Sequence, residues 1–256
     1  MKKIVCLYKP VGETPLETIL RFKTELSEYS GQKVSAAGRL DPMAEGLLLV
    51  LIGDENKNRN QYEALEKTYR FSVLFGITTD SYDLLGLPIL NRNKPLENDA
   101  IEKLHHYTDS LVGTQLQPYP PFSSKTVQGK PLYYWAREGK IHEIEIPAKT
   151  ITISKLKYQN QSTISAKNLG ETINEVIPRI EGQFRQTEIL EEWNNLLSSN
   201  PDATFSLLSF SITCSSGTYV RSIAHQMGEY LQTKALAYSI ERTQIGNYTL
   251  EDAVHI

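Results

Sequence analysis

Residues 46–53, GLLLVLIG, constrain the fold more than any other stretch of this chain. The run is short, fully apolar and bounded by glycines, which is typical of a strand buried on both faces in the middle of a sheet. The residues before it read AAGRLDPMAE, so Asp41 and Pro42 stand just before the predicted strand. The sequence therefore predicts a central strand with one carboxylate just before its N-terminal end.

The flanking segments predict a mixed α and β domain around that strand. Apolar runs and alternating side chains predict further strands over residues 3–8, 68–76 and 205–214. Apolar side chains at helical spacing predict helices over residues 12–26, 96–108 and 220–231. Helices and strands do not alternate regularly, so the sequence predicts an α+β fold.

One stretch stands apart from this pattern. Residues 159–203 are polar, contain Pro178 and include one amphipathic helix over residues 188–197. We interpret them as a peripheral insertion. A chain of 256 residues is long enough to bury a sizeable core with such an insertion attached.

Composition narrows the class of protein. The net charge of −3 argues mildly against a nucleic-acid binder, although a local basic patch can supply the charge that phosphate binding needs. Cys6 and Cys214 form no paired motif, which favours a reduced, cytoplasmic protein without a zinc site. No stretch of the sequence is long enough to span a membrane.

Asp41 has two interpretations. An Asp-Pro pair often forms a turn or a helix cap, and that would be its ordinary role. Three features favour chemistry instead: Gly38 removes bulk nearby, an apolar strand follows, and Arg39 is adjacent while Arg221 lies in a second unusual segment. A carboxylate held against an arginine stays ionised and fixed, as a carboxylate nucleophile requires.

The second unusual segment, CSSGTYVRSIAHQMG, joins a predicted strand to a predicted helix. Tyr219 and Arg221 fall in the first turn of that helix, off its core face, at a place where sites often form. The alternatives are a salt-bridged arginine and a packing aromatic. Tyr69 could likewise be only an aromatic on a strand.

Residues 121–140 interleave Lys125, Lys130, Arg137 and Lys140 with aromatic side chains. This mixture suits a single-stranded or looped RNA, because cations contact phosphates and rings stack on bases. The alternative is an amphipathic helix over residues 131–139 that packs its aromatic side chains.

Five segments in order resemble the TruB family of tRNA pseudouridine synthases: YKPVGETP, GRLDPMAEGLLLVLIG, EKTYRFSVLFGITTDSYD, PPFSSKTVQGKPLYYWAREG and CSSGTYVRSIAHQMGEYL. The resemblance implies one pseudouridine synthase catalytic domain over residues 1–256. Its central sheet would be mixed and mostly antiparallel, flanked by helices, with a thumb-like RNA-binding insertion at residues 121–140. It also implies isomerisation of uridine 55 in the T loop of tRNA by base flipping and an aspartate nucleophile, without cofactor or metal.

Residue by residue, the resemblance implies three catalytic side chains. Asp41 matches the catalytic aspartate, and Arg221 matches the arginine paired with it. Tyr69 matches the tyrosine that stacks on the target base and is a candidate to relay its proton.

The same comparison implies three further substrate-binding residues. Lys67 is the lysine of the motif that contains the stacking tyrosine, and Tyr219 matches a tyrosine that contacts uridine. Ile240 stands where the family usually has a leucine that packs on the base.

Two departures from the family are visible. Ser35 and Ala36 stand where most members have a Gly-His pair whose histidine contacts the RNA backbone, so we expect weaker loop binding. The chain stops at Ile256, so we expect no C-terminal domain of the PUA type.

The resemblance implies tRNA, through its T stem-loop, as the partner of a monomeric enzyme that does not bind membranes. One alternative is a pseudouridine synthase for ribosomal RNA, because RLD followed by GLLLV is also similar to those enzymes. The other is a non-catalytic protein that binds or folds tRNA.

Overall fold

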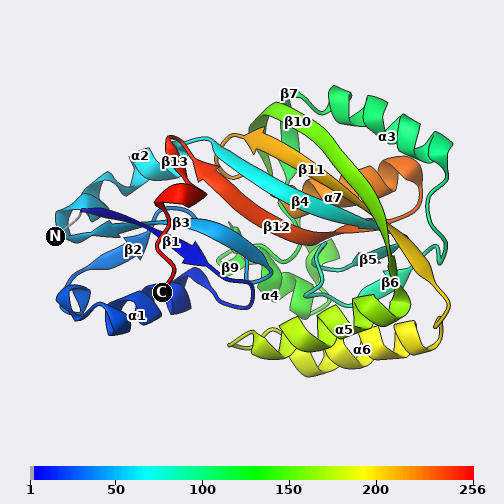
Figure 1. Ribbon diagram of the computed structural model, residues 1–256, viewed down its shortest axis with the longest axis horizontal. Coiled ribbons are helices and arrows are strands. Elements are labelled where there is room, and N and C mark those ends of the chain that lie inside the picture. Colours follow the sequence, from blue (N-terminus) through cyan, green and yellow to red (C-terminus); the bar gives the residue numbers. More distant parts are fainter. Residues whose placement is uncertain (1–2) are drawn as a thin grey trace.

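The structure is a computed structural model that describes residues 3–256 (Figure 1). One large sheet has the order β1-β3-β12-β4-β11-β10-β7, with β2 paired to β3 and β13 to β12. Its strands are β1 (Ile4–Lys9), β2 (Val34–Ala36), β3 (Ala44–Ile52), β4 (Lys67–Phe75), β7 (Gly113–Pro118), β10 (Ala148–Ser165), β11 (Thr204–Cys214), β12 (Ala235–Ile245) and β13 (Tyr248–Thr249). All neighbours are antiparallel except β12 and β3, which confirms the predicted mixed, mostly antiparallel sheet.

Helices cover both faces of this sheet. The α-helices are α1 (Pro15–Glu25), α2 (Arg59–Ala64), α3 (Asn98–Ser110), α4 (Leu132–Arg137), α5 (Ala166–Val176), α6 (Gln186–Ser198) and α7 (Val220–Leu231). On β4, Phe71 belongs to the same apolar cluster as Met227 of α7, whereas Leu74 belongs to the cluster of Trp193 in α6. In Figure 1, α3 and α7 lie toward the top of the molecule and α5 and α6 toward the bottom.

The apolar run at residues 46–53 forms most of β3, between β1 and β12. The side chains at positions 47–51 are 0% exposed, which confirms the predicted central strand. Because β3 begins at Ala44, the turn that carries Asp41 is attached directly to the most deeply buried part of the core. We call residues 38–43 the Asp41 turn.

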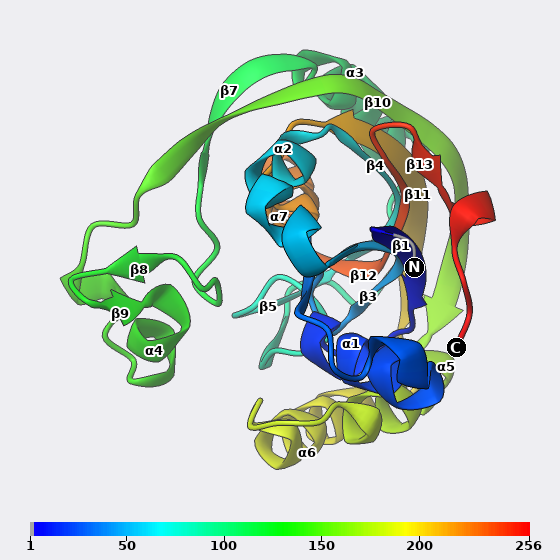
Figure 2. The same cartoon turned by 90° about the vertical axis from the view of Figure 1, so that its left-hand side faces the viewer.

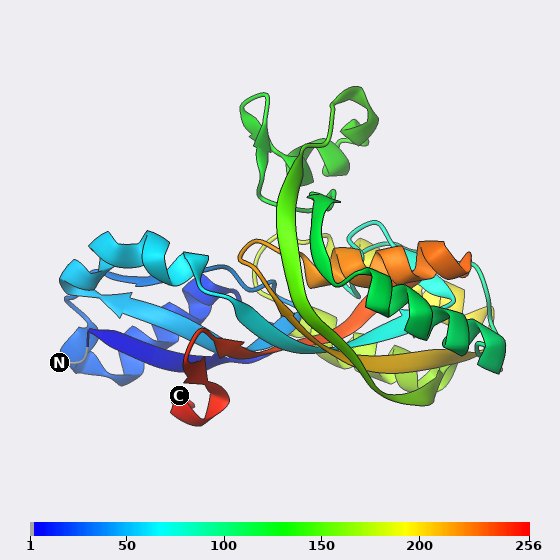
Figure 3. The ribbon, with the colours of Figure 1, turned by 90° about the horizontal axis from the view of Figure 1, so that it is seen from above.

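Between β7 and β10 the chain leaves the body and returns as a thumb, defined here as residues 119–147. It contains β8 (Thr126–Val127), β9 (Lys130–Pro131) and α4. Figures 2 and 3 show it projecting from the sheet on the extended β7 and β10. A thumb-like insertion was predicted here, and the structure confirms its shape.

The expected insertion at residues 159–203 differs from the structure at its start. Residues 160–165 pair with β11 and so belong to the central sheet. No clear strand signal marks this part of the sequence, because β10 exposes most of its side chains and its pairing is interrupted twice by register shifts. Beyond it come α5, a short 3-10 turn (Ile177–Arg179) and α6, so the segment has two α-helices where one was expected. We call residues 166–198 the α5–α6 hairpin.

Two smaller features complete the fold. A short hairpin of β5 (Ile77–Thr79) and β6 (Pro88–Leu90) encloses residues 80–87, which approach the Asp41 turn. Across residues 3–256, no helix has both the length and the apolar character needed to cross a membrane.

The close approach of β3 to β12 gives a stability prediction. Gly46 in β3 has φ +103°, and a Cβ built there would lie 2.4 Å from the carbonyl oxygen of Arg242 in β12. We expect Gly46→Ala to lower the free energy of unfolding by at least about 2 kcal/mol, because alanine disfavours positive φ and the strand cannot move without opening the sheet. Chemical denaturation followed by circular dichroism measures this difference.

Gly31→Ala is the matched control, because no atom of residues 3–256, apart from the glycine and its chain neighbours, lies within 4 Å of the added Cβ. Its free energy of unfolding should stay within about 0.5 kcal/mol of the wild-type value. Equal stability of the two variants would contradict the tight contact between β3 and β12.

Candidate active site

Asp41 and Arg221 form the centre of the candidate site. Nε of Arg221 donates to Oδ2 of Asp41 at 2.9 Å, although the two residues are 180 positions apart. The Asp41 side chain is 38% exposed, whereas the Arg221 side chain is 4% exposed. The backbone carbonyl of Asp41 also accepts from the Ala44 amide at 3.0 Å. Asp41 therefore has the turn role of the first interpretation and presents its carboxylate beside a buried cation.

The other donors of Arg221 hold two further segments. Nη1 donates to the carbonyl of Ser81 at 2.7 Å, and Nη2 donates to the carbonyl of Phe122 at 3.0 Å. Burial acts to lower the pKa of Arg221, but the carboxylates of Asp41 and Asp83 outweigh it and raise that pKa. The guanidinium is therefore a fixed charge that joins the Asp41 turn, the 80–87 segment and the root of the thumb.

Asp83 is a buried carboxylate that the sequence analysis did not select. Its Oδ1 accepts from the Ser81 hydroxyl at 2.6 Å and from the Leu85 amide at 3.0 Å. Burial raises the pKa of Asp83 to about 6, while the charge of Arg221 opposes this shift. The signal for it was the polar run TTDSYD directly after an apolar strand.

Tyr69 and Ile240 lie in the apolar cluster beside the Asp41 turn. Tyr69 in β4 is 9% exposed and Ile240 in β12 is 8% exposed, and both share that cluster with Leu40 and Ala44. Burial raises the pKa of the Tyr69 hydroxyl, and the negative charge of Asp41 adds to the effect while Arg242 opposes it. The predicted base-stacking residues are thus close to the turn that carries the carboxylate.

Tyr219 is held at the start of α7 by a side chain of β7. The Gln117 amide group accepts from the Tyr219 N–H at 2.8 Å and donates to its carbonyl at 3.1 Å. The Tyr219 ring packs edge-on against Tyr119, with centroids 5.8 Å apart, and the Arg221 guanidinium lies 5.5 Å from its centroid. Tyr219 therefore lies beside the ion pair.

Lys67 is placed differently from the other predicted binding residues. Its ammonium group donates to the carbonyls of Glu63 and Leu65, each at 2.5 Å. Its side chain is buried, and burial lowers the pKa of Lys67 to about 8. Its polar partners are thus backbone carbonyls at the C-terminal end of α2, just before β4. This placement favours a role in supporting the strand that carries Tyr69 over contact with a substrate.

A cavity of about 370 Å³ opens at the ion pair. Asp41 and Arg221 form part of its wall. The other lining residues are Ser81, Asp83 and Leu85, Phe122, Tyr133 and Arg137 of the thumb, and residues 183–185 of the α5–α6 hairpin. Sequence reasoning did not select the hairpin residues, because nothing in a polar insertion indicates where it folds back. A second cavity of about 440 Å³, between α3 and α7, contains none of the predicted site residues.

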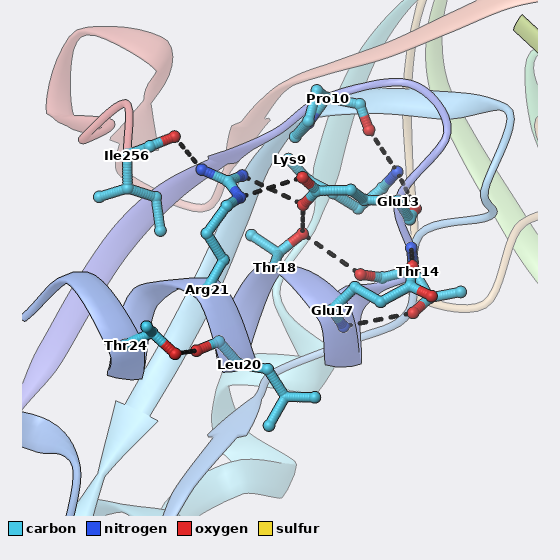
Figure 4. Close-up of polar contacts among 10 residues, drawn as sticks. All are labelled: Lys9, Pro10, Glu13, Thr14, Glu17, Thr18, Leu20, Arg21, Thr24 and Ile256. Carbon is cyan, nitrogen blue, oxygen red and sulfur yellow. Dashed lines mark hydrogen bonds and ion pairs between the residues drawn. The ribbon is translucent and has the colours of Figure 1, made fainter. Parts of the chain in front are cut away.

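A polar network at the start of α1 (Figure 4) holds the loop that contacts the Asp41 turn. The buried ammonium group of Lys9 donates to the carbonyl of Glu13 at 2.6 Å, and the carboxylate of Glu13 accepts from Arg21 of α1 at 3.0 Å. Burial lowers the pKa of Lys9 to about 8, against the opposing charges of Asp41 and Glu13. The loop held in this way donates from the Gly12 amide to the Pro42 carbonyl at 2.9 Å, so the network fixes the turn.

The described residues offer no obvious metal site: within residues 3–256 no three His, Cys, Asp or Glu side chains are grouped to bind a metal ion. The arrangement instead presents a carboxylate that is ion-paired, partly exposed and bordered by aromatic side chains. Such a group can act as a nucleophile or a general base toward a planar base that enters the cavity.

Comparisons with solved structures identify the fold. The chain is similar to a chain in "Crystal Structure of a Cbf5-Nop10-Gar1 Complex", with a TM-score of 0.60, 16% identity, and coverage of 99% of this chain and 52% of that chain. A chain in "Structure of H/ACA RNP bound to a substrate RNA containing 2'-deoxyuridine" gives a TM-score of 0.55 at 15% identity, covering 98% of this chain and 50% of that one. This likeness confirms the predicted pseudouridine synthase fold.

Comparisons of sequence identify the family. The chain is 29% identical over 255 residues to tRNA pseudouridine synthase B of Levilactobacillus brevis, covering 99% of this chain and 70% of that protein. It is 30% identical over 248 residues to the protein of the same name from Aquifex aeolicus, covering 97% and 70%. Residues 26–168 match the family described as TruB family pseudouridylate synthase (N terminal domain). That match spans more than half of the chain and includes the Asp41 turn and the whole thumb, so the chain belongs to the TruB family of pseudouridylate synthases.

Proposed function

We propose that this pseudouridine synthase isomerises uridine 55 in the T loop of tRNA, with Asp41 as the nucleophile. The observation that carries the proposal is the ion pair between Asp41 and the buried Arg221 at the mouth of the cavity. The names of the bacterial relatives support tRNA as the substrate class. The five family-like segments around these residues support position 55 and the T loop.

The reaction rearranges one nucleoside and needs no net gain or loss of atoms. The target uridine leaves its stack and enters the cavity, where the Asp41 carboxylate adds to the ribose or to the pyrimidine ring. The bond between C1′ and N1 breaks, the base rotates, and C5 bonds to C1′ while the bond to the Asp41 oxygen breaks and restores the carboxylate. The proton on C5 leaves and N1 is protonated, with the Tyr69 hydroxyl as the candidate relay.

The surroundings of Asp41 match the needs of this reaction. Arg221 orients the carboxylate through a charge-assisted hydrogen bond. The apolar cluster that contains Tyr69 and Ile240 limits the access of water while the base is detached. Tyr219 adds an aromatic wall beside the ion pair.

The thumb has the features expected of an RNA-binding element. α4 buries Leu132 fully, but Tyr133 is 41% exposed and Tyr134 is 36% exposed. The ammonium group of Lys130 lies 4.0 Å from the centre of the Tyr134 ring, and the Arg137 guanidinium lies 5.7 Å from that of Tyr133. Exposed rings paired with cations suit base stacking and phosphate contact better than they suit a packed helix.

The two alternatives make different predictions for modified RNA. If the protein modifies ribosomal RNA, its deletion leaves pseudouridine 55 in tRNA and abolishes a pseudouridine in ribosomal RNA. If it is a non-catalytic tRNA-binding protein, its deletion abolishes no pseudouridine. Mapping pseudouridine in both RNA classes from the deletion strain distinguishes the three functions.

Asp41→Asn tests the nucleophile. The change keeps the size of the side chain and most hydrogen bonding but removes the charge, so pseudouridine formation should vanish. Binding of tRNA should stay within a few fold of wild type. Tritium release from uridine-labelled tRNA measures turnover. Asp99→Asn, on an exposed ion pair of α3 with Lys103, is the control and should keep full activity.

Residual turnover in Asp41→Asn, with contaminating wild-type enzyme excluded, would falsify the nucleophile role. If Asp41 only formed the turn, the variant would lose stability while keeping its activity per folded molecule.

Arg221→Lys tests the positioning of Asp41. Lysine keeps the charge, but a single ammonium group cannot reach the three acceptors that Arg221 holds on separate segments. We expect turnover to fall about 100-fold or more, as misplacement of a reacting group by about 1 Å can do. Binding of tRNA should change little. Single-turnover kinetics and a filter-binding assay measure the two quantities separately.

The control is Arg70→Lys, whose arginine makes an ion pair with Glu241 and has a side chain that is 63% exposed. It should be as active as wild type. Full activity of Arg221→Lys would mean that Asp41 needs only a nearby positive charge.

A further inference from the structure

The α5–α6 hairpin reaches from the edge of the molecule into the Asp41 cavity. Its two helices pack side by side under the sheet (Figure 1), and its tip, residues 183–185, lines the cavity in contact with the thumb. None of these tip residues takes part in the proposed reaction steps, although they lie at the opening of the cavity that contains Asp41.

The hairpin is anchored firmly enough to hold a side chain in place. Trp193 of α6 is fully buried, and its Nε1 donates to the carbonyl of Leu84 at 3.1 Å. The same apolar cluster includes Leu85, which also lines the cavity. The tip is therefore fixed relative to the 80–87 segment, which Arg221 also holds.

Arg185 is the residue that this anchoring places in the cavity wall. Its backbone has φ 63° and ψ 30°, a left-handed conformation that side-chain-bearing residues seldom adopt. Its Nη2 donates to Oδ2 of Asp80 at 2.9 Å, and its guanidinium lies 4.5 Å from the centre of the Phe122 ring. The side chain is 19% exposed, so the guanidinium is oriented from two sides and open to the cavity.

Part of the hydrogen-bonding capacity of Arg185 is unused. Within residues 3–256, neither Nε nor Nη1 of Arg185 makes a hydrogen bond. From the thumb, Arg137 donates to the carbonyl of Gln183 and has no carboxylate partner among the same residues. Two guanidinium groups from separate segments thus line one cavity, with donors that a further anion could use.

We propose that Arg185, assisted by Arg137, binds a backbone phosphate of the RNA strand whose uridine enters the cavity. This inference rests on the proposed function. A nucleotide that approaches Asp41 brings its flanking phosphates to the cavity rim, and guanidinium groups bind phosphate with paired, charge-assisted hydrogen bonds. Arg185 is then a positioning residue, and the α5–α6 hairpin is an RNA-binding element that complements the thumb.

A purely structural role is the competing explanation. In that case Arg185 would only tie the hairpin to Asp80, which also accepts from the Leu87 amide at 2.9 Å. Asp80→Asn weakens this tie without removing the cation. If Arg185 binds phosphate, Asp80→Asn keeps the salt dependence of RNA binding. If Arg185 is only a structural tie, Asp80→Asn loses as much RNA affinity as Arg185→Gln.

The test measures binding of an isolated T stem-loop RNA by fluorescence anisotropy across a series of KCl concentrations, in the full chain carrying Asp41→Asn. We expect Arg185→Gln to raise Kd about tenfold. The plot of the logarithm of the binding constant against the logarithm of the salt concentration should become shallower by about 1 unit of slope, as loss of one phosphate contact does. Asp80→Asn should leave that slope unchanged. Arg179→Gln, on an exposed ion pair of the same hairpin, is the matched control for charge and should match its parent.

A second measurement uses enzyme that retains Asp41. Arg185→Gln should raise KM for the stem-loop by the same factor and keep kcat within about threefold, because the contact acts on binding rather than on the chemical step. Arg185→Lys should recover part of the affinity and the full salt slope. If Arg185→Gln lowers thermal stability, this lysine variant still reports on the charge.

Two results would overturn the inference. The first is a Kd and salt slope for Arg185→Gln equal to those of Arg179→Gln. The second is the same loss of affinity in Asp80→Asn and Arg185→Gln, which would show a structural tie. Failure of the proposed function is a separate result: the wild-type chain would release no tritium from uridine-labelled tRNA, while the binding test would still be decided in the Asp41→Asn chain.

Discussion

The buried guanidinium of Arg221 is the interaction on which the site depends. Its donors reach the Asp41 carboxylate and the carbonyls of Ser81 and Phe122, which come from segments far apart in the sequence. A charge with so little exposure must find acceptors inside the protein, because an unpaired buried charge is very unfavourable. The Asp41 turn, the 80–87 segment and the root of the thumb therefore share one arrangement, and the cavity forms where they meet.

A second buried arginine fixes the Asp41 turn from the side of the sheet. Nε of Arg242 donates to the carbonyl of Leu47 at 2.8 Å, and Nη1 donates to the carbonyl of Arg39 at 2.9 Å. Arg242 lies on β12, which approaches β3 so closely that Gly46 leaves no room for a side chain. The backbone of the turn is thus bound to the sheet while its carboxylate is bound to α7, and only the cavity side of the carboxylate stays open.

Much of the frame was predictable because its signals are local. The apolar run of β3, the alternation of β4 and β11 and the helical spacing of α7 each follow from side chains within one element. β10 was missed for a physical reason. Beyond Ile153 it pairs, among the described residues, with β11 alone and exposes most of its side chains, so it lacks the period of two that marks a half-buried strand.

The sequence by itself determined the class of fold, the family and the small set of candidate residues, because Asp41, Tyr69, Tyr219 and Arg221 stand in short segments with recognisable chemistry. Only the tertiary structure decided which of them meet. It gave the Asp41–Arg221 pair, which the family resemblance implied, its 2.9 Å contact, and it turned Lys67 toward backbone carbonyls. It also brought Arg185 to the cavity through long-range packing of Trp193. Contacts of that kind depend on how helices and strands pack across the whole core, and no local pattern of residues encodes them.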